Sequence, residues 1–214
     1  MRRDELPGEA AVFPLAGALL LPRGKLPLNI FEPRYLAMIE DALGEGRVIG
    51  MIQPDDNRPE GPNGPALYSV GCLGRIASFS ETDDGRFLVT LAGVSRFRVR
   101  EEVKTRRGYR RVALTTASFD QDMASEQPEP AFDRPALLDA LRAYFDARNF
   151  QANWSAIDEM DAGALVTTLS MVCPFEPVEK QALLEAADTT ARADTLRALL
   201  QMGAHGTDDH HPAS

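Results

Sequence analysis

The chain has 214 residues, of which 44% are hydrophobic and 26% are charged, and its formal net charge is -9. These values are ordinary for a folded globular protein, and with only two cysteines they exclude both a disordered chain and a disulfide-built scaffold. The acidic excess disfavours nucleic acid as the main partner, because phosphate binding needs a basic surface.

The N-terminus has some features of a signal peptide, since Arg2-Arg3 precedes an apolar run over residues 10–21. Acidic residues at Asp4 and Glu5, together with Pro14 inside the run, argue against export. No stretch reaches the roughly 18 apolar residues that a membrane helix needs. We therefore expect a cytoplasmic protein that does not span a membrane.

The first 118 residues are typical of short strands, because apolar and polar residues alternate between Gly and Pro residues. Asp84-Gly85 supplies the positive φ angles of a tight hairpin turn, so residues 86–91 should pair back on residues 76–81. Pro33 and Gly44 mark the start and end of one inserted helix. The other strands are expected at residues 11–15, 25–31, 47–53, 67–80, 94–103 and 109–119.

The second half of the chain reads as helical. Residues 120–131 are polar and contain two prolines, which predicts a linker. Beyond them, apolar residues recur at helical spacing as far as Gly203 and predict a bundle. The expected organisation is a β-rich subdomain, a linker, a helical subdomain and a disordered tail, over residues 1–119, 120–131, 132–203 and 204–214.

Residues 86–111 form a basic stretch, with nine Lys or Arg side chains and two acidic ones. Arg96, Arg98 and Arg100 alternate with Phe97 and Val99, which places the three arginines on one face of the expected strand. That face is either an ordinary solvated surface or a binding surface for an acidic peptide or RNA. The sequence leaves both readings open.

Catalytic and metal-binding motifs are missing. Gly17 and Gly24-Lys25 have the wrong spacing for a phosphate-binding loop. All three histidines lie in the segment 205–211, so the folded body has no imidazole that can act as a general base. Asp208-Asp209-His210-His211 reads as a solvated tail rather than a metal site. We expect no enzyme, no cofactor and no bound metal.

The run from Phe13 to Gly24, followed by Leu26 to Tyr35, resembles the opening signature of the N-terminal domain of Lon proteases. The resemblance continues at residues 68–76, 84–87, 91–99 and 179–185 and covers residues 11–202 in all. It implies an α+β fold, with a twisted, barrel-like (PUA-like), mostly antiparallel β subdomain that carries one inserted helix, followed by a C-terminal α-helical bundle.

In Lon this domain precedes an ATPase module and a Ser/Lys peptidase module, and the twelve residues after Met202 cannot hold either. The resemblance thus implies a non-catalytic module that binds unfolded or exposed protein segments, as an adaptor or regulator of proteolysis, with a Lon-type protease as a further candidate partner. The alternative is an RNA-associated or small-ligand regulatory module that uses the basic strand face. The sequence does not determine the oligomeric state.

The expected binding surface is an apolar groove beside the first helix. Leucines are frequent in residues 19–21 and 26–31, and Pro22 and Pro27 forbid regular strand pairing on that side of the segment. The opposing interpretation is that Leu20 belongs to the core and that residues 31–35 only build the start of the helix. The candidate peptide-contacting residues are Leu20, Leu28, Phe31, Tyr35, Arg96, Arg98 and Arg100.

Overall fold

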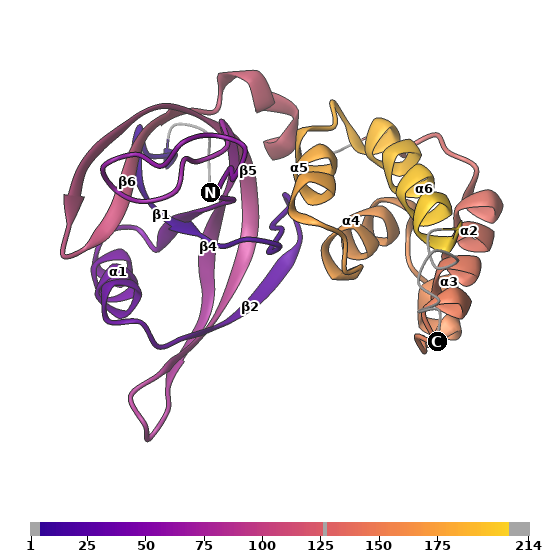
Figure 1. Ribbon diagram of the computed structural model, residues 1–214, viewed down its shortest axis with the longest axis horizontal. Coiled ribbons are helices and arrows are strands. Elements are labelled where there is room, and N and C mark those ends of the chain that lie inside the picture. Colours follow the sequence, from indigo (N-terminus) through magenta and orange to yellow (C-terminus); the bar gives the residue numbers. More distant parts are fainter. Residues whose placement is uncertain (1–4, 126–127, 206–214) are drawn as a thin grey trace, which may run out of the picture. The chain divides into compact units, whose positions relative to one another are not determined.

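The computed structural model describes residues 5–125 and 128–205 (Figure 1). The chain divides into two compact units, Met1–Gln127 and Pro128–Ser214, which are called unit 1 and unit 2 below. The division falls inside the segment 120–131, where the polar, proline-containing sequence predicts a linker.

Unit 1 contains a six-stranded sheet with the strand order β2-β5-β4-β3-β1-β6. Strand β5 also pairs with β6, so the pairings run from β1 through β3, β4, β5 and β6 back to β1. All pairs are antiparallel except β1 with β3, and β2 lies at the edge beside β5. The strands are β1 (Glu9–Pro14), β2 (Lys25–Ile30), β3 (Val48–Ile52), β4 (Val70–Glu81), β5 (Phe87–Arg106) and β6 (Tyr109–Thr115).

Strand β5 is one strand of 20 residues, whereas the sequence predicts two strands interrupted before Val94. Ala92 and Gly93 continue the pairing with β4, so the interruption is not real. The predicted hairpin is confirmed, because Gly85 has a φ of 78° and the Thr82 N–H donates to the Arg86 carbonyl over 2.9 Å. In Figure 1 this magenta hairpin extends away from the rest of unit 1.

The core of unit 1 forms around Phe97, which is fully buried. Its ring lies where two glycines of neighbouring strands leave room: a Cβ at Gly71 would be 2.5 Å from Phe97 Cζ, and one at Gly50 would be 3.0 Å away. Buried aliphatic side chains surround it, namely Ala10, Val12, Ile52, Leu67, Leu73, Val112 and Leu114.

Helix α1 (Pro33–Gly44) has the bounds that the sequence predicts, with proline at its start. It packs against β1, β3 and β6. The Glu32 side chain makes no capping hydrogen bond and instead pairs with Arg34 at 2.9 Å.

The last element of unit 1 is a 3-10 helix, η2 (Ala117–Met123). The strand predicted to end at Phe119 stops at Thr115, and residues 120–123 of the predicted linker belong to η2. Asp122 is buried in this unit. The β-rich part therefore extends beyond residue 119, because a buried side-chain contact that the local sequence does not reveal holds η2 in place.

Unit 2 is helical. Its helices are α2 (Arg134–Ala147), α3 (Trp154–Asp158), α4 (Ala162–Val172), α5 (Pro177–Glu185) and α6 (Thr189–His205). The side chains of Asp133, Asn153 and Asp161 accept hydrogen bonds at the N-termini of α2, α3 and α4, which satisfies amides that a helix start leaves without partners. Buried Leu137, Leu141, Leu165 and Leu169 lie on the predicted apolar stripes.

Two details of unit 2 differ from the sequence expectation. The short helix α3 is not foreseen, and α6 continues past Gly203 to His205. The rest of the expected tail, residues 206–214, lies outside the described residues. None of the helices in residues 5–125 and 128–205 is long and apolar enough to cross a membrane.

Candidate functional site

The structure places Leu20 in the core. It is 1% exposed, and its neighbours Leu19 and Leu21 are also buried. A Cβ at Gly74 would lie 2.7 Å from Leu20 Cδ2, so Leu20 fills the space that this glycine of β4 leaves. The expected groove lined by Leu20 is wrong, because these leucines form the packed interior rather than a surface.

The other apolar candidates are divided between the interior and the surface. The Tyr35 ring is buried against Phe13, with a centroid distance of 4.1 Å. Leu28 is half-buried in β2. Phe31, which directly follows β2, is 63% exposed and is the candidate most accessible to a partner.

Arg96 does not share a solvated face with Arg98 and Arg100. It is 4% exposed, and η2 covers it. Its Nε and Nη2 donate to the two oxygens of Asp122 over 2.9 Å each, and its backbone N–H donates to the same carboxylate over 2.9 Å. The guanidinium also lies 4.6 Å from the centroid of the Phe119 ring. Arg98 and Arg100 remain exposed.

Most of the basic stretch is neutralised within unit 1. Carboxylates pair with Arg86, Arg96, Arg106, Arg107, Arg110 and Arg111. In the part of the chain that the structure describes, three of the nine basic side chains, Arg98, Arg100 and Lys104, have no ion pair. The excess positive charge of residues 86–111 is therefore used mainly inside the fold.

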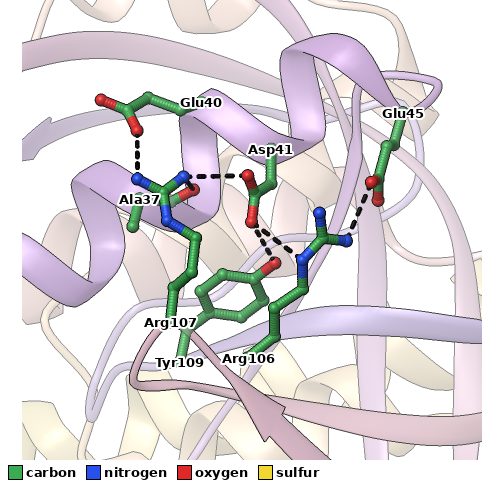
Figure 2. Close-up of polar contacts among 7 residues, drawn as sticks. All are labelled: Ala37, Glu40, Asp41, Glu45, Arg106, Arg107 and Tyr109. Carbon is green, nitrogen blue, oxygen red and sulfur yellow. Dashed lines mark hydrogen bonds and ion pairs between the residues drawn. The ribbon is translucent and has the colours of Figure 1, made fainter.

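Figure 2 shows how the turn between β5 and β6 is fastened to α1. Arg107 donates to Glu40 over 2.7 Å and to Asp41 over 2.9 Å, and Arg106 donates to Glu45 over 2.8 Å. The Tyr109 hydroxyl donates to Asp41 Oδ2 over 2.7 Å. Burial and this hydrogen bond raise the pKa of Tyr109 to about 12, and the same bond is the largest cause lowering the pKa of Asp41. Each of these charged or hydroxyl side chains binds another one of the set, which indicates a structural role rather than a binding site.

A different surface of unit 1 is hollowed and lined by uncharged residues. An open hollow of about 420 Å³ lies on the β2-β5-β4 part of the sheet, and none of the nine residues that line it is charged. The pairings Pro27–Thr90–Ser78 and Asn29–Leu88–Ser80 place six of the nine on the same side of the sheet. We call these six residues the uncharged face. Leu88 is 45% exposed there, and the hollow is also lined by Phe79, which is 39% exposed.

The buried nucleophilic and basic groups of unit 2 are engaged with the protein. Burial raises the pKa of the Cys173 thiol to about 12, which keeps it protonated. The Lys180 Nζ donates to the Met171 carbonyl over 3.1 Å, and the Ser170 hydroxyl donates to the Val166 carbonyl over 2.7 Å. Among the residues that the structure describes, no group of three His, Cys, Asp or Glu side chains is arranged to hold a metal ion.

Comparison with known proteins identifies the family. Residues 9–202 match the family described as the ATP-dependent protease La (LON) substrate-binding domain. This chain belongs to the Lon substrate-binding domain family. The match covers both units, so the family relationship extends through the helical half.

Curated relatives in the Lon substrate-binding domain family are much longer than this chain. A Lon protease of Flavobacterium johnsoniae is 27% identical over 206 residues, which are 92% of this chain and 24% of that protein. A Lon protease of Anaeromyxobacter dehalogenans is 27% identical over 104 residues, which are 49% of this chain and 12% of the relative. The chain thus spans a quarter or less of the length of these relatives.

Solved structures support the fold of this Lon substrate-binding domain. A Lon N-terminal domain protein from Xanthomonas campestris has a TM-score of 0.61 at 22% identity, over 89% of this chain and 97% of that one. The N-terminal domain of a Mycobacterium avium complex Lon protease has a TM-score of 0.58 at 18% identity, over 95% of this chain and 100% of that one. At such identities the likeness shows a shared mixed α+β fold.

Proposed function

We propose that this chain binds exposed, extended segments of other proteins at the uncharged face of unit 1 and performs no chemistry itself. The observation that carries the proposal is the hollow on β2, β5 and β4, whose nine lining residues carry no charge although charged residues are 26% of the chain. Depletion of charge at a surface that still exposes Leu88 is typical of the centre of a protein interface.

The absence of chemistry is supported by the engagement of the reactive groups. The Cys173 thiol is held protonated, and Lys180 and Ser170 are bound to main-chain carbonyls. The family match is to a substrate-binding domain rather than to a catalytic one. We expect the purified chain neither to hydrolyse ATP nor to cleave an unfolded protein.

Several finer features belong to the same proposal. The chain acts in the cytoplasm as an adaptor or regulator of proteolysis, with a Lon-type protease as a candidate partner. Unit 1 is a PUA-like pseudo-barrel, which the closed series of strand pairings from β1 back to β1 supports. Of the seven candidate contact residues, Phe31 and Leu28 lie at or beside β2, and Arg98 and Arg100 contribute only to long-range attraction.

The alternative of RNA or small-ligand binding by the basic strand face has weaker support, because six of the nine cations in residues 86–111, Arg96 of that face included, are paired with carboxylates. If Arg98, Arg100 and Lys104 contacted phosphates, the logarithm of RNA affinity would fall linearly with the logarithm of salt concentration, with a slope of about -2 for single strands. A salt titration with labelled RNA measures this slope.

Introducing a negative charge on or next to the uncharged face tests the proposal. The probe is reduced, carboxymethylated α-lactalbumin labelled with fluorescein, and the readout is anisotropy. Leu88→Asp and Phe31→Asp should each weaken binding at least about tenfold, because an unpaired carboxylate resists desolvation. Val172→Asp is the matched control, because Val172 lies in unit 2 and is 63% exposed, like Phe31. Equal binding by all variants with unchanged circular dichroism would refute the proposed surface.

A further inference from the structure

The free edge of the sheet lies beside the uncharged face. Among the described residues, β2 pairs with β5 and with no other strand. Two hydrogen bonds just beyond the ends of the strand pairings show which residues of β2 point their N–H and C=O groups toward β5 and which point them outward. The Gly93 N–H donates to the Gly24 carbonyl over 2.8 Å, and the Thr82 N–H donates to the Arg86 carbonyl over 2.9 Å.

In an antiparallel pair, hydrogen-bonded and non-bonded positions alternate. The bonded Gly24–Gly93 position therefore makes Leu26, Leu28 and Ile30 the residues that bond to β5. The β4–β5 pair gives the same result. Because Thr82 and Arg86 are hydrogen-bonded, the backbone groups of Leu88 and Thr90 point toward β4, and those of Phe87 and Val89 point toward β2.

The remaining residues of β2 point their backbone outward. Lys25, Pro27 and Asn29 offer three carbonyl acceptors along the free edge, and Lys25 and Asn29 offer two N–H donors. Pro27 has no N–H, and its position agrees with the rule that proline in a strand occurs where the missing donor would face solvent. The side chains of Pro27 and Asn29 belong to the uncharged face.

We propose that the bound protein segment adds to the free edge of β2 as an extra strand, with every second side chain on the uncharged face. This inference rests on the proposed function and specifies how the segment is held. Main-chain bonds to Lys25, Pro27 and Asn29 supply sequence-independent affinity, while the hollow beside them selects apolar, uncharged side chains. A surface that must accept many different unfolded sequences benefits from such backbone recognition.

Pro27 keeps the edge from pairing with a second copy of the chain. In a twofold antiparallel pair of β2 strands, both copies would lack the central N–H, whereas a bound segment meets a single missing donor. The net charge of -9 on each copy also opposes self-association. A foreign extended segment therefore suits this edge better than a second copy.

Backbone methylation of a model peptide tests strand addition. The probe is a fluorescein-labelled decapeptide in which leucine and threonine alternate between two lysines, and fluorescence anisotropy gives its affinity. One derivative carries N-methyl groups on alternate leucines and another on alternate threonines. Methylation in one phase should weaken binding at least about tenfold, because it removes N–H groups that face β2, and methylation in the other phase should have little effect.

The set of residues at which methylation weakens binding also shows whether the peptide runs parallel or antiparallel to β2. With leucine side chains on the uncharged face, leucine methylation blocks antiparallel addition and threonine methylation blocks parallel addition. Equal affinities of the two derivatives, while the unmodified peptide binds, would overturn strand addition and leave the proposed function standing. Failure of the unmodified peptide to bind as well would overturn both.

Variants of β2 provide the complementary measurement. Asn29→Pro removes an outward N–H without removing a bond to β5, so it should weaken the unmodified peptide by about fivefold to tenfold. Pro27→Ala supplies the missing donor and should strengthen it by about twofold to tenfold. Thermal melts check that both variants fold. If sedimentation shows instead a wild-type dimer that Asn29→Pro dissociates, a second copy occupies the edge and the inference is wrong.

Discussion

The two units use their cationic side chains differently. In unit 1, arginines pair with carboxylate side chains of other elements, as Arg96 does with Asp122 and Arg107 with Glu40. In unit 2, the buried or half-buried cations donate to main-chain carbonyls where helices end. Arg134 donates to the carbonyls of Ile157, Asp158 and Met160, Lys180 to that of Met171, and Arg192 to that of Leu183.

The difference follows from the secondary structure. A helix leaves its last carbonyls without partners and carries partial negative charge at that end, so a cation from the next helix stabilises it. In a sheet whose pairings close on themselves few carbonyls are free, and the two buried arginines of this unit, Arg96 and Arg110, pair with the carboxylates of Asp122 and Glu102. Unit 1 should therefore depend on particular pairs of residues, and unit 2 on donors at helix ends.

Glycine substitutions give the largest expected contrast. A Cβ at Gly93 would lie 1.9 Å from the Leu21 carbonyl oxygen, which is backbone, whereas one at Gly203 would lie 2.5 Å from Tyr144 Cε2, which is a side chain. We expect Gly93→Ala to cost more than about 4 kcal/mol and to unfold unit 1. Gly203→Ala should cost about 1–3 kcal/mol, because the Tyr144 ring can shift.

Hydrogen exchange measured by mass spectrometry reports each unit in the intact chain, and fluorescence of Trp154, the one tryptophan, reports unit 2. Gly8→Ala is the control, because no atom lies within 4 Å of its added Cβ. A stable Gly93→Ala protein would mean that the segment ending at Leu21 does not cross β5 closely.

The next largest effect concerns the Arg96–Asp122 pair. Asp122→Ala leaves a buried guanidinium without its carboxylate and should cost about 3–5 kcal/mol, while exchange in residues 117–125 rises. The double variant Arg96→Met with Asp122→Leu should recover most of this loss, because it buries no unpaired charge. The free energy of unfolding is measured in urea. If the double variant is no more stable than Asp122→Ala, the loss comes from the three missing hydrogen bonds and not from a buried charge without a partner.

Arg134 gives the corresponding test in unit 2. Arg134→Met removes the donor to three carbonyls near the end of α3 and should cost about 1.5–3 kcal/mol, with faster exchange at residues 154–160. Arg197→Met removes only an exposed ion pair to Asp194 at 3.6 Å and should cost under about 1 kcal/mol. Equal effects of the two changes would contradict the proposed importance of helix-end donors.

These contrasts also show which features the sequence reveals. The strands, the hairpin at Gly85 and helix α1 follow from local alternation and turn residues, and the structure confirms them. The continuity of β5 does not, because Ala92-Gly93 reads as an interruption. Gly93 is needed there because the chain near Leu21 crosses it, and that contact joins residues far apart in sequence.

The candidate site was only partly predictable for a similar reason. Alternation correctly places Arg96 on the opposite face from Phe97, yet solvation of that face depends on η2, which follows Arg96 by more than 20 residues. The uncharged face combines pairs of residues from β2, β4 and β5, so it emerges only when the register of all three strands is known. The sequence feature that could have indicated this face is the absence of charged residues at positions 78, 80, 88 and 90.

The smallest effects concern alkaline pH, where each unit should weaken because one buried group in it has a raised pKa. Tyr109 has a pKa of about 12 against an ordinary value of 10.0, because it is buried and bound to Asp41. Its folded state thus holds a proton that the unfolded state releases first, so its contribution is complete below pH 10 and is lost as pH rises toward 12. The Cys173 thiol behaves alike between pH 9 and 12, through burial alone.

Single substitutions should separate the two contributions. Tyr109→Phe should flatten the pH dependence of hydrogen exchange protection in α1 and β6 above pH 10, and should leave that of unit 2 unchanged. Cys173→Ala should do the reverse. Tyr109→Phe also removes the main group that lowers the pKa of Asp41, so carbon-13 NMR should find that carboxyl titrating at higher pH. An unchanged Asp41 titration would mean that Arg106 and Arg107 alone hold it ionised, and that Tyr109 contributes by burial.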